Sequence, residues 1–300
     1  MNYHTPVMLW ESINGLNIDP SGIYVDATFG GGGHSREILA RLTEGRLFGL
    51  DQDKEAFSNI PANEKFCFIH GNFRFIRNYL RYYGISKVDG IMADLGISSH
   101  HIDMPDRGFS YNREARLDMR MNTASSFTAA GLINHYSRTE LQRIFKTWGE
   151  LENSRSLADA IIKYRENTEI LYNHQLIEAV SSFIPSRHEK KYLSKLFQSL
   201  RIEVNREIFN LKELLLQSVR LLKKGGRLVI ISYHSIEDRL VKNFIRYGNP
   251  EGEIRKDIYG NQKLFFKSIN KKPFVPTDAE IKTNSRARSA RLRIAEKMDD

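Results

Sequence analysis

The first candidate for a ligand-binding site is a run of four consecutive glycines in the stretch YVDATFGGGGHSREIL, residues 24–39. Glycine loses more backbone entropy on folding than any other residue, so this run indicates a place where a bare backbone is needed. Asp51 ends the next apolar run about 20 residues on, where a carboxylate can accept hydrogen bonds from a ribose. A nucleoside-bearing cofactor is the favoured interpretation, and a tight structural turn is the alternative.

A second carboxylate, Asp94, ends the apolar run VDGIMAD. An acid that directly follows three apolar residues is a poor core residue, so we expect Asp94 to have a functional role. His234 follows a later apolar run, where loop structure and function are equally good explanations. Ser235 and Asp238 have spacing like that of a helix capping box, which is a structural explanation for both.

Two other chemistries are disfavoured. The stretch His100-His101-Ile102-Asp103 contains metal-ligand types, but no other His or Cys cluster at ligand spacing supports it, so we expect no metal. The chain also lacks the GxxxxGK[ST] pattern, so a phosphate-cradling P-loop is not expected.

The elements that must position these residues alternate through the first third of the chain. Predicted strands cover residues 23–28, 46–51, 66–71 and 88–94, and predicted helices cover 34–42, 53–60 and 73–84. This alternation predicts βαβ units and a parallel sheet, because parallel strands need a crossover connection. Ligands bind at the carboxyl edge of such a sheet, where both candidate carboxylates would lie.

The alternation stops after Asp94. From about Phe127 to about Leu200 the apolar residues have helical spacing, and Ser137 with Glu140 forms a capping-box pattern. We therefore expect an inserted helical domain. The expected fold class is α/β, and the expected domains are residues 1–108, 109–203 and 204–300.

The α/β pattern resumes with a long helix predicted over residues 204–222. Lys223 to Gly226 should end that helix, with glycine at a left-handed C-cap. A strand over 227–233 and a helix over 234–247 follow. The tail contains two further candidate strands, 263–268 and 289–295.

Composition favours an anionic partner. The chain of 300 residues has a formal net charge of +9, and nucleic acid is the commonest partner of a basic protein. A generally basic surface is the alternative. The basic residues of the segment 282–297 outnumber its single acid, Glu296; they are Lys282, Arg286, Arg288, Arg291, Arg293 and Lys297.

The sequence also indicates in which cellular compartment the protein is expected. No stretch approaches the roughly 18 apolar residues of a membrane span. The N-terminal residues do not have the pattern of a secretory signal. The single cysteine, Cys67, lies in an apolar run typical of a buried thiol, and it excludes an internal disulfide. We expect a cytoplasmic protein with no membrane association.

A series of motifs runs in order along nearly the whole chain: GIYVDATFGGGGHSREIL, GLDQD, HGNF, DGIMADLGISS, DRGFSY, LDMRM, RIEVNREI, GGRLVIISYHSIEDR and RARSARLR. Together they resemble the RsmH (MraW) family of S-adenosylmethionine-dependent methyltransferases, which modify the N4 amine of a cytidine in small-subunit ribosomal RNA. The resemblance implies a class I (Rossmann-like) methyltransferase sheet with an inserted helical domain. It also implies S-adenosylmethionine as cofactor and 16S ribosomal RNA, in the decoding region of the small subunit, as substrate.

The resemblance further implies which residues contact the cofactor. Asp51 would bind the ribose, Phe73 would lie along the adenine, and Asp94 would lie near the methionine end. His101 stands where the family often has Gln, and we include it among the contacts. The full set is Gly32, Gly33, His34, Asp51, Phe73, Asp94 and His101.

The expected mechanism is mainly alignment, because the sulfonium cofactor is already activated while the cytosine amine is a poor nucleophile. A group must still accept the N4 proton. Asp94 is the first candidate catalytic residue, His234 and Ser232 are second choices, and a cofactor-orienting role for Asp94 is the competing interpretation.

Arginines are the expected RNA contacts, because they can hold phosphates while the target base leaves its stack. The candidates are Arg107, Arg116, Arg120, Arg286 and Arg288. The first three lie around LDMRM, for which a mixed-charge surface is the alternative. A homodimer is compatible with the sequence.

Three rival functions are compatible with these residues. A DNA amino-methyltransferase is the nearest, although ADLGISS lacks the Pro-Pro-aromatic motif typical of those enzymes. A nicotinamide dehydrogenase would share the glycine turn and Asp51. A non-catalytic RNA-binding protein that retains the cofactor fold is the third.

Overall fold

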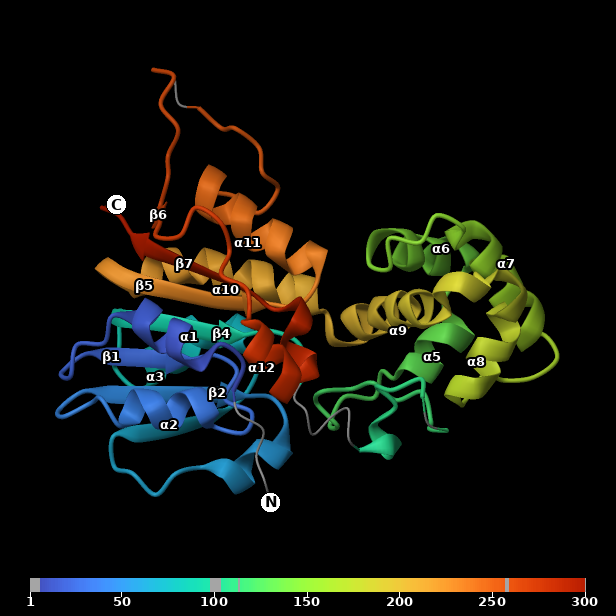
Figure 1. Ribbon diagram of the computed structural model, residues 1–300, viewed down its shortest axis with the longest axis horizontal. Helices are drawn as coiled ribbons and strands as arrows, with labels where there is room; N and C mark the ends of the chain where they lie inside the picture. Colours follow the sequence, from blue (N-terminus) through green and yellow to red (C-terminus); the bar gives the residue numbers. More distant parts are fainter. Residues whose placement is uncertain (1–5, 98–103, 113, 257–258, 300) are drawn as a thin grey trace. The chain divides into compact units, whose positions relative to one another are not determined.

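The computed structural model describes residues 6–97, 104–112, 114–256 and 259–299 (Figure 1). The chain divides into two compact units, one made of Met1–Gly96 with Phe209–Asp300 and the other of Ile97–Ile208. The divisions expected from the sequence, after residues 108 and 203, fall 12 residues later and 5 residues earlier than these. No change of hydrophobic period marks either division, because the first lies in an irregular segment and the second lies within the first turn of the helix Glu207–Leu221.

The first unit contains a seven-stranded sheet in the order β3-β2-β1-β4-β5-β7-β6. Its strands are β1 Ile23–Asp26, β2 Arg46–Asp51, β3 Phe66–His70, β4 Val88–Asp94, β5 Leu222–Ser232, β6 Phe266–Ser268 and β7 Arg291–Lys297. The first five run parallel, whereas β7 is antiparallel to both β5 and β6. The predicted α/β fold class and parallel sheet are confirmed.

Helices cover this sheet on both faces (Figure 1). They are α1 Leu9–Leu16, α2 Gly33–Leu39, α3 Ile76–Tyr82, α10 Glu207–Leu221, α11 Ser235–Tyr247 and α12 Asp278–Thr283, with short 3-10 helices η1 Lys54–Asn59, η2 Phe73–Phe75 and η6 Ser285–Ser289. Met92, Val229 and Ile231 belong to the core shared with α1 and α2. Their neighbours Leu228 and Ile230 are also buried, and successive side chains of a strand point to opposite faces, so both faces are dry.

The second unit is helical, as the apolar spacing predicts. Its helices are α5 Ala129–His135, α6 Arg138–Thr147, α7 Ser154–Arg165, α8 Asn173–Val180 and α9 Glu189–Asn205, with 3-10 helices η3 Pro105–Arg107, η4 Ser181–Phe183 and η5 Ser186–His188. The predicted capping box of Ser137 and Glu140 begins α6. Leu141, Ile144 and Phe145 of that helix lie in one buried cluster with residues of the other helices.

Two local expectations are wrong. The helix predicted over 204–222 is two helices, because Arg206 adopts a left-handed conformation, φ 52°, that ends α9 before α10 begins. Lys223 to Gly226 do not form a helix C-cap but belong to β5, where they bulge between the pairs Val88–Leu222 and Gly90–Arg227. Gly225 has φ 77°, so its positive φ belongs to this bulge and not to a helix end.

No helix in the parts of the chain that the structure describes is long and apolar enough to cross a bilayer.

Candidate active site

The candidate site lies where the order of the strands reverses. From β1 the chain moves outward to β2 and β3, then crosses back to β4 on the other side of β1. In open α/β sheets, ligands bind outside the carboxyl ends of the strands at such a switch point. The glycine turn follows β1 and Asp94 ends β4, so both predicted features stand at this point.

The glycine turn joins β1 to α2 through two left-handed residues, Gly30 with φ 50° and Gly32 with φ 71°. A Cβ atom on Gly32 would lie 2.9 Å from the ring of Phe29, so a side chain there would be both strained and crowded. A Cβ atom on Gly30 would meet nothing closer than 3.9 Å, so this backbone borders open space. Gly33 begins α2, and its Cα is covered by Pro6, 2.1 Å from the position of a Cβ.

His34 does not point its ring toward a ligand site. The ring is buried, and Nε2 lies 3.1 Å from the carbonyl oxygen of Val7. Burial lowers the pKa of His34 to about 4, with the Val7 carbonyl opposing, so the ring is neutral at physiological pH. What His34 can offer a ligand is its backbone N–H in the first turn of α2, where helix amides have no intrahelical partner.

Asp51 and Phe73 lie at the ends of adjacent strands. Asp51 Oδ2 accepts a hydrogen bond of 2.7 Å from the Gly30 N–H, which ties the end of β2 to the glycine turn. The turn after β2 and the turn after β3 are joined by Asn72 Nδ2, which donates to Gln52 Oε1 at 2.7 Å. Phe73 follows Asn72, is half-buried and begins η2. The structure thus brings together the residues expected at the ribose and at the adenine.

Asp94 is held by the strands on either side of β4. Its N–H donates to Thr28 Oγ1 at 2.7 Å, and its Oδ1 accepts from the Tyr233 hydroxyl at 2.7 Å. Burial raises the pKa of Asp94 to about 7; the bond from Tyr233 opposes that rise, and the charges of Asp26 and Glu237 add to it. Burial, reinforced by the charge of Asp94, raises the pKa of Tyr233 well above its ordinary value, so the hydroxyl remains a donor.

The structure adds two residues that the sequence analysis did not single out. Asp26 ends β1 buried, and its carboxylate accepts from the Ser35 hydroxyl at 2.7 Å and from the Thr28 N–H at 3.1 Å. Burial raises the pKa of Asp26 to about 6. Asp26 follows Ile23, Tyr24 and Val25 as Asp94 follows its apolar run, so the same signal is present in the sequence. Tyr233 carried no such signal, because a tyrosine at the end of a buried strand is ordinary.

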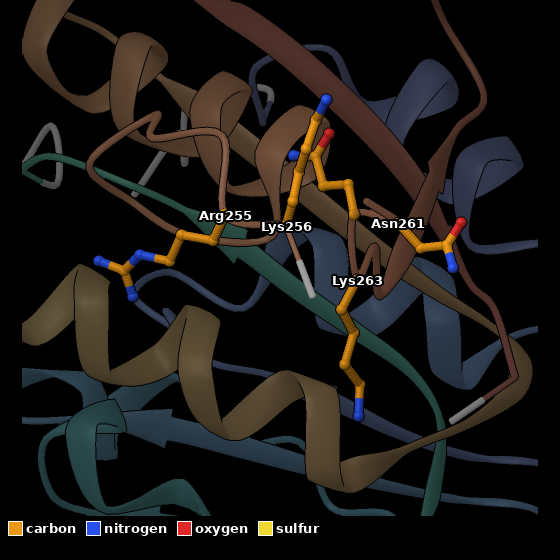
Figure 2. Close-up of a pocket in the computed structure, with 5 residues that line it drawn as sticks. Arg255, Lys256, Asn261 and Lys263 are labelled. Atoms are coloured by element: carbon orange, nitrogen blue, oxygen red, sulfur yellow. The ribbon is translucent and has the colours of Figure 1, made fainter. Parts of the chain in front are cut away.

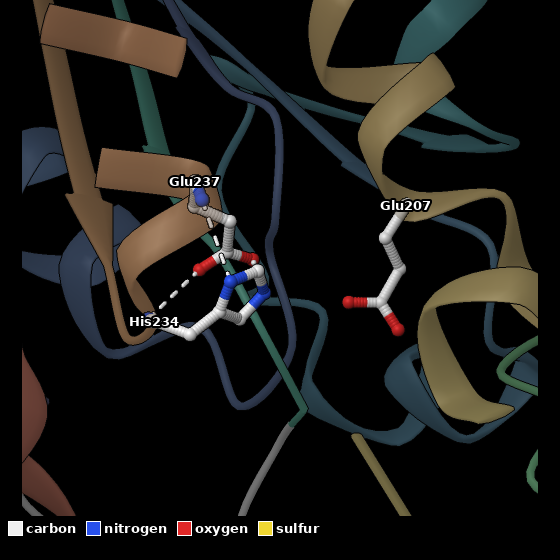
Figure 3. Close-up of side chains that lie close together, drawn as sticks. All are labelled: Glu207, His234 and Glu237. Atoms are coloured by element: carbon white, nitrogen blue, oxygen red, sulfur yellow. Dashed lines mark hydrogen bonds and ion pairs between the residues drawn. The ribbon is translucent and has the colours of Figure 1, made fainter. Parts of the chain in front are cut away.

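His234 and Ser232, the second-choice candidates for proton acceptor, both make contacts that hold the fold together. His234 is the N-cap of α11: its Nδ1 accepts from the Glu237 N–H, and its Nε2 lies 3.1 Å from Glu237 Oε1 (Figure 3). Ser232 is buried and donates to the carbonyl of Arg291 on β7 at 3.3 Å. Glu207, also drawn in Figure 3, belongs to the other unit, where it pairs with Arg201 at 2.9 Å.

The cap of α11 corrects an expectation from the sequence. His234 and Glu237 form the capping box, not Ser235 and Asp238. Asp238 instead accepts from Arg293 Nε at 2.7 Å and from Arg291 Nη1 at 3.1 Å, which fastens α11 to β7. His101, expected among the cofactor contacts, lies outside the described residues.

The candidate RNA contacts differ in exposure. Arg107 is buried, and its guanidinium donates to the carbonyls of Arg120 and Met121. Arg120 pairs with Asp118 at 2.5 Å. Both therefore have structural partners within the second unit. Arg116 is exposed, with its guanidinium 6.0 Å from the centre of the Tyr172 ring.

The two tail arginines lie on η6, where Arg288 is exposed and Arg286 is half-buried. A basic cavity of about 470 Å³ lies in the segment between α11 and β6 (Figure 2). Its lining includes none of the residues expected to contact cofactor or RNA; it consists of Arg255, Lys256, Asn261, Gln262 and Lys263.

The fold and site together define a class of protein. The strand order 3-2-1-4-5-7-6 with an antiparallel β7, a glycine turn after β1, and acids at the ends of β2 and β4 describe a class I, Rossmann-like methyltransferase.

Comparison with known proteins specifies the family. The model of the MraW methylase family matches residues 1–298. A "Ribosomal RNA small subunit methyltransferase H" of Parabacteroides distasonis is 53% identical over 298 residues, covering 99% of this chain and 98% of the relative. A protein of the same name from Cytophaga hutchinsonii is 54% identical over 297 residues, covering 98% and 99%. The chain belongs to the MraW methylase family.

This membership confirms the predicted family, the enzyme class of methyltransferase and S-adenosylmethionine as the cofactor. The solved structures that resemble this chain are much less similar to it in sequence than these relatives are. An rRNA methylase from Streptococcus thermophilus covers 100% of this chain and 99% of its own, with 13% identity and a TM-score of 0.41, too distant to carry an inference.

Proposed function

We propose that this protein transfers the methyl group of S-adenosylmethionine to the N4 amine of a cytidine in 16S ribosomal RNA of the small ribosomal subunit. The observation that carries the proposal is identity above 50%, along nearly the whole chain, to relatives named ribosomal RNA small subunit methyltransferase H. The residues at the switch point supply the chemistry that such a reaction needs.

The residues at the switch point fit S-adenosylmethionine, which supplies an activated methyl group on a cationic sulfur. The backbone at Gly30 borders open space, as a site for a closely approaching ligand requires. Asp51 stands at the end of β2, where a carboxylate oxygen can accept a second hydrogen bond from a ribose hydroxyl. Burial raises the pKa of Asp94, and a cationic group bound beside it would stabilise its ionised form.

We assign the role of proton acceptor to Asp94. Its carboxylate is half-buried and is oriented by the Tyr233 hydroxyl, which donates to one of its two oxygens. With a pKa near 7, the group is close to the operating pH, where general bases are most effective. Ser232 and His234 rank lower because both are committed to contacts that hold β7 and α11 in place.

The RNA contacts that we retain are Arg116, Arg286 and Arg288. Arg116 and Arg288 are exposed, whereas Arg107 and Arg120 are engaged by neighbouring carbonyls and by Asp118. The helical second unit, Ile97–Ile208, would then share in RNA recognition with the tail. An RNA of the small subunit as substrate implies a cytoplasmic enzyme.

A homodimer remains part of the proposal. Its support is a set of exposed apolar residues close to the edge strand β6, namely Ile269, Phe274 and Val275, with exposures of 43%, 45% and 63%. Sedimentation equilibrium of the purified protein would test it, and a monomer at micromolar concentration would remove it.

The test of the function is methyl transfer from labelled S-adenosylmethionine to isolated small subunits, large subunits, free ribosomal RNA and DNA. Nucleoside mass spectrometry then identifies the product. We expect N4-methylated cytidine from small-subunit RNA alone. Methylated DNA would support the amino-methyltransferase alternative, and no transfer to any substrate would support a non-catalytic RNA-binding protein.

A further inference from the structure

One surface of the first unit combines arginine and aromatic side chains without any acid. It is formed by η2 and α3 and consists of Arg74, Phe75, Arg77, Arg81 and Tyr82, which we call the α3 face. From residue 65 to residue 88 the chain has five basic residues and no Asp or Glu. Tyr82 is 85% exposed and Phe75 is 41% exposed, which is unusual for large aromatic rings.

The arginines of the α3 face are not neutralised by the protein. Among the described residues, Arg74, Arg77 and Arg81 form no ion pair, and the guanidinium of Arg74 instead lies 4.4 Å from the centre of the Phe75 ring. Several other arginines of the chain are paired with acids, as in Arg143–Glu203 and Arg293–Asp238. Adjacent like charges without a counterion indicate a place for an anionic partner.

The α3 face is also firmly supported. Ile76 and Leu80, on the opposite side of α3, are buried. The side chain of Gln217 on α10 donates to the carbonyl of Arg74 at 2.6 Å and accepts from the N–H of Arg77 at 3.0 Å. Tyr83 packs against Phe48 with ring centres 5.5 Å apart and meets Tyr82 edge to face at 5.3 Å. Tyr82 is therefore held from one side while most of its surface remains exposed.

We propose that the α3 face binds a single-stranded segment of the substrate RNA next to the target cytidine. The proposal rests on the proposed function. Proteins bind single strands by pairing cationic side chains with phosphates and by stacking bases on exposed aromatic rings, and this face has both. It also begins at the site, because Phe73, expected along the adenine, directly precedes Arg74 at the carboxyl end of β3. RNA entering the site can thus continue along α3.

The test compares two pairs of substitutions with equal loss of charge. Arg77→Ala/Arg81→Ala changes the α3 face, and Lys242→Ala/Arg246→Ala changes two exposed cationic residues of α11, which packs against β5, β6 and β7. Binding of small-subunit RNA is measured across a salt series. We expect the α3 pair to reduce the slope of log K against log salt by about 1.4, or roughly 0.7 for each bound phosphate. The α11 pair should leave the slope unchanged.

Stacking has its own variants. Tyr82→Ala should weaken RNA binding about tenfold, since one stacked base contributes on this order, and Tyr82→Phe should retain affinity because it keeps the ring. Affinity for S-adenosylmethionine should be unchanged in every variant, which separates RNA binding from damage to the fold.

The results of these experiments separate failure of the α3-face proposal from failure of the proposed methyltransferase function. If the unaltered enzyme methylates small-subunit RNA but neither α3 variant changes the salt slope or the affinity, the α3 face does not bind RNA. If the variants instead impair binding of a ribosomal protein or of a second copy of this chain, the occupant is protein and the inference is wrong. If the unaltered enzyme neither binds nor methylates ribosomal RNA, both proposals are overturned.

Discussion

At the scale of single residues, the site depends on a series of partly buried hydrogen bonds across three strands. Asp26 binds the N–H of Thr28, Thr28 accepts from the N–H of Asp94, and Asp94 accepts from the hydroxyl of Tyr233. Together these bonds join the ends of three parallel strands, so the carboxylate of Asp94 has a fixed direction. The same burial that fixes Asp94 raises its pKa to about 7.

The first prediction concerns Asp94→Asn. General bases contribute about 10²–10⁴-fold, so we expect turnover at pH 8 to fall at least 100-fold while the dissociation constant for S-adenosylmethionine changes only a few-fold. Time courses of methyl transfer and calorimetry measure these two quantities. Failure to bind the cofactor would favour the orienting role, and turnover near that of the unaltered enzyme would show that Asp94 is not the essential acceptor.

The second prediction concerns the pH dependence of the unaltered enzyme. The ionised form of Asp94 accepts the proton, so kcat/KM should rise as pH increases through about 7 and then level off. Tyr233→Phe removes a hydrogen bond that favours the ionised form, so the midpoint should move about one unit higher, equivalent to ~1.4 kcal/mol. A midpoint that moves lower or stays fixed would contradict this arrangement.

At the scale of elements, the four glycines of the turn have different structural roles, although the sequence alone does not distinguish them. Gly32 must be left-handed and must also pass close to Phe29, whereas Gly30 must be left-handed beside open space. The sequence showed that a bare backbone was needed between a strand and a helix. It did not show which neighbour approaches each glycine, because Phe29 and Pro6 reach the turn only through the tertiary fold.

The third prediction compares Gly32→Ala with Gly84→Ala. Their φ angles are 71° and 74°, so both substitutions introduce similar backbone strain of about 1–2 kcal/mol. Only Gly32 would also place a Cβ 2.9 Å from another side chain, next to the candidate cofactor site. We expect Gly32→Ala to weaken S-adenosylmethionine binding at least tenfold and Gly84→Ala to leave it unchanged, as measured by calorimetry. Equal effects would remove the turn from the cofactor site.

The fourth prediction concerns the attachment of α11 to β7. Burial alone would raise the pKa of Asp238, but the bonds from Arg293 and Arg291 outweigh it and lower the pKa below the ordinary 3.8. Asp238→Asn leaves the buried Arg293 without its counterion, so the free energy of unfolding should fall by about 3–5 kcal/mol at pH 7. The control is Asp299→Asn, which breaks an exposed pair with Lys224 and should cause little change in urea unfolding.

The sign of the pH effect follows from the lowered pKa of Asp238. This ion pair contributes its full stability above the ordinary aspartate pKa and loses it as pH falls through the lower, folded-state value. The difference between Asp238→Asn and the unaltered protein should therefore shrink in acid. A difference that persists unchanged below about pH 3 would mean that the carboxylate charge is not what holds Arg293.

Features that depend on interactions between residues near in sequence were predictable, whereas features that depend on residues distant in sequence were not. Strands β1 to β4, with Asp51 at the end of β2 and Asp94 at the end of β4, follow from local hydrophobic period, and these predictions are confirmed. The burial of the His34 ring against Val7, and the pairing of Asp238 with Arg291 and Arg293, depend on segments distant in sequence. Arg206 gave no warning of a break between α9 and α10, because an arginine has no intrinsic preference for the left-handed conformation.

At the scale of the whole molecule, only some of the basic residues behind the net charge of +9 are available to bind RNA. Many basic residues are engaged in structural pairs, such as Arg201 with Glu207 and Arg227 with Glu296. Within the described part of the chain, exposed arginines for which no ion pair is found include Arg77 and Arg81 of the α3 face, Arg116, Arg246 and Arg288. We therefore expect RNA affinity to depend on which of these arginines contact the RNA and not on total charge.

The fifth prediction follows from that distribution. Arg286→Ala/Arg288→Ala should weaken binding of small-subunit RNA and reduce the slope of log K against log salt by about 0.7 for each phosphate that is no longer bound. Lys242→Ala/Arg246→Ala removes the same charge and serves as the control. An unchanged slope would exclude the tail from the RNA interface.

The strand order also constrains how this protein can be synthesised. β4 lies at the centre of the sheet, but its partner β5 is translated only after the whole segment Ile97–Ile208. At about 5–20 residues per second, the nascent chain carries one unpaired, apolar edge of β4 for on the order of ten seconds. The helical unit has its own core and can fold during that delay. Ribosome stalling between these two strands should therefore cause aggregation of the nascent chain even when every residue of the finished enzyme is unchanged.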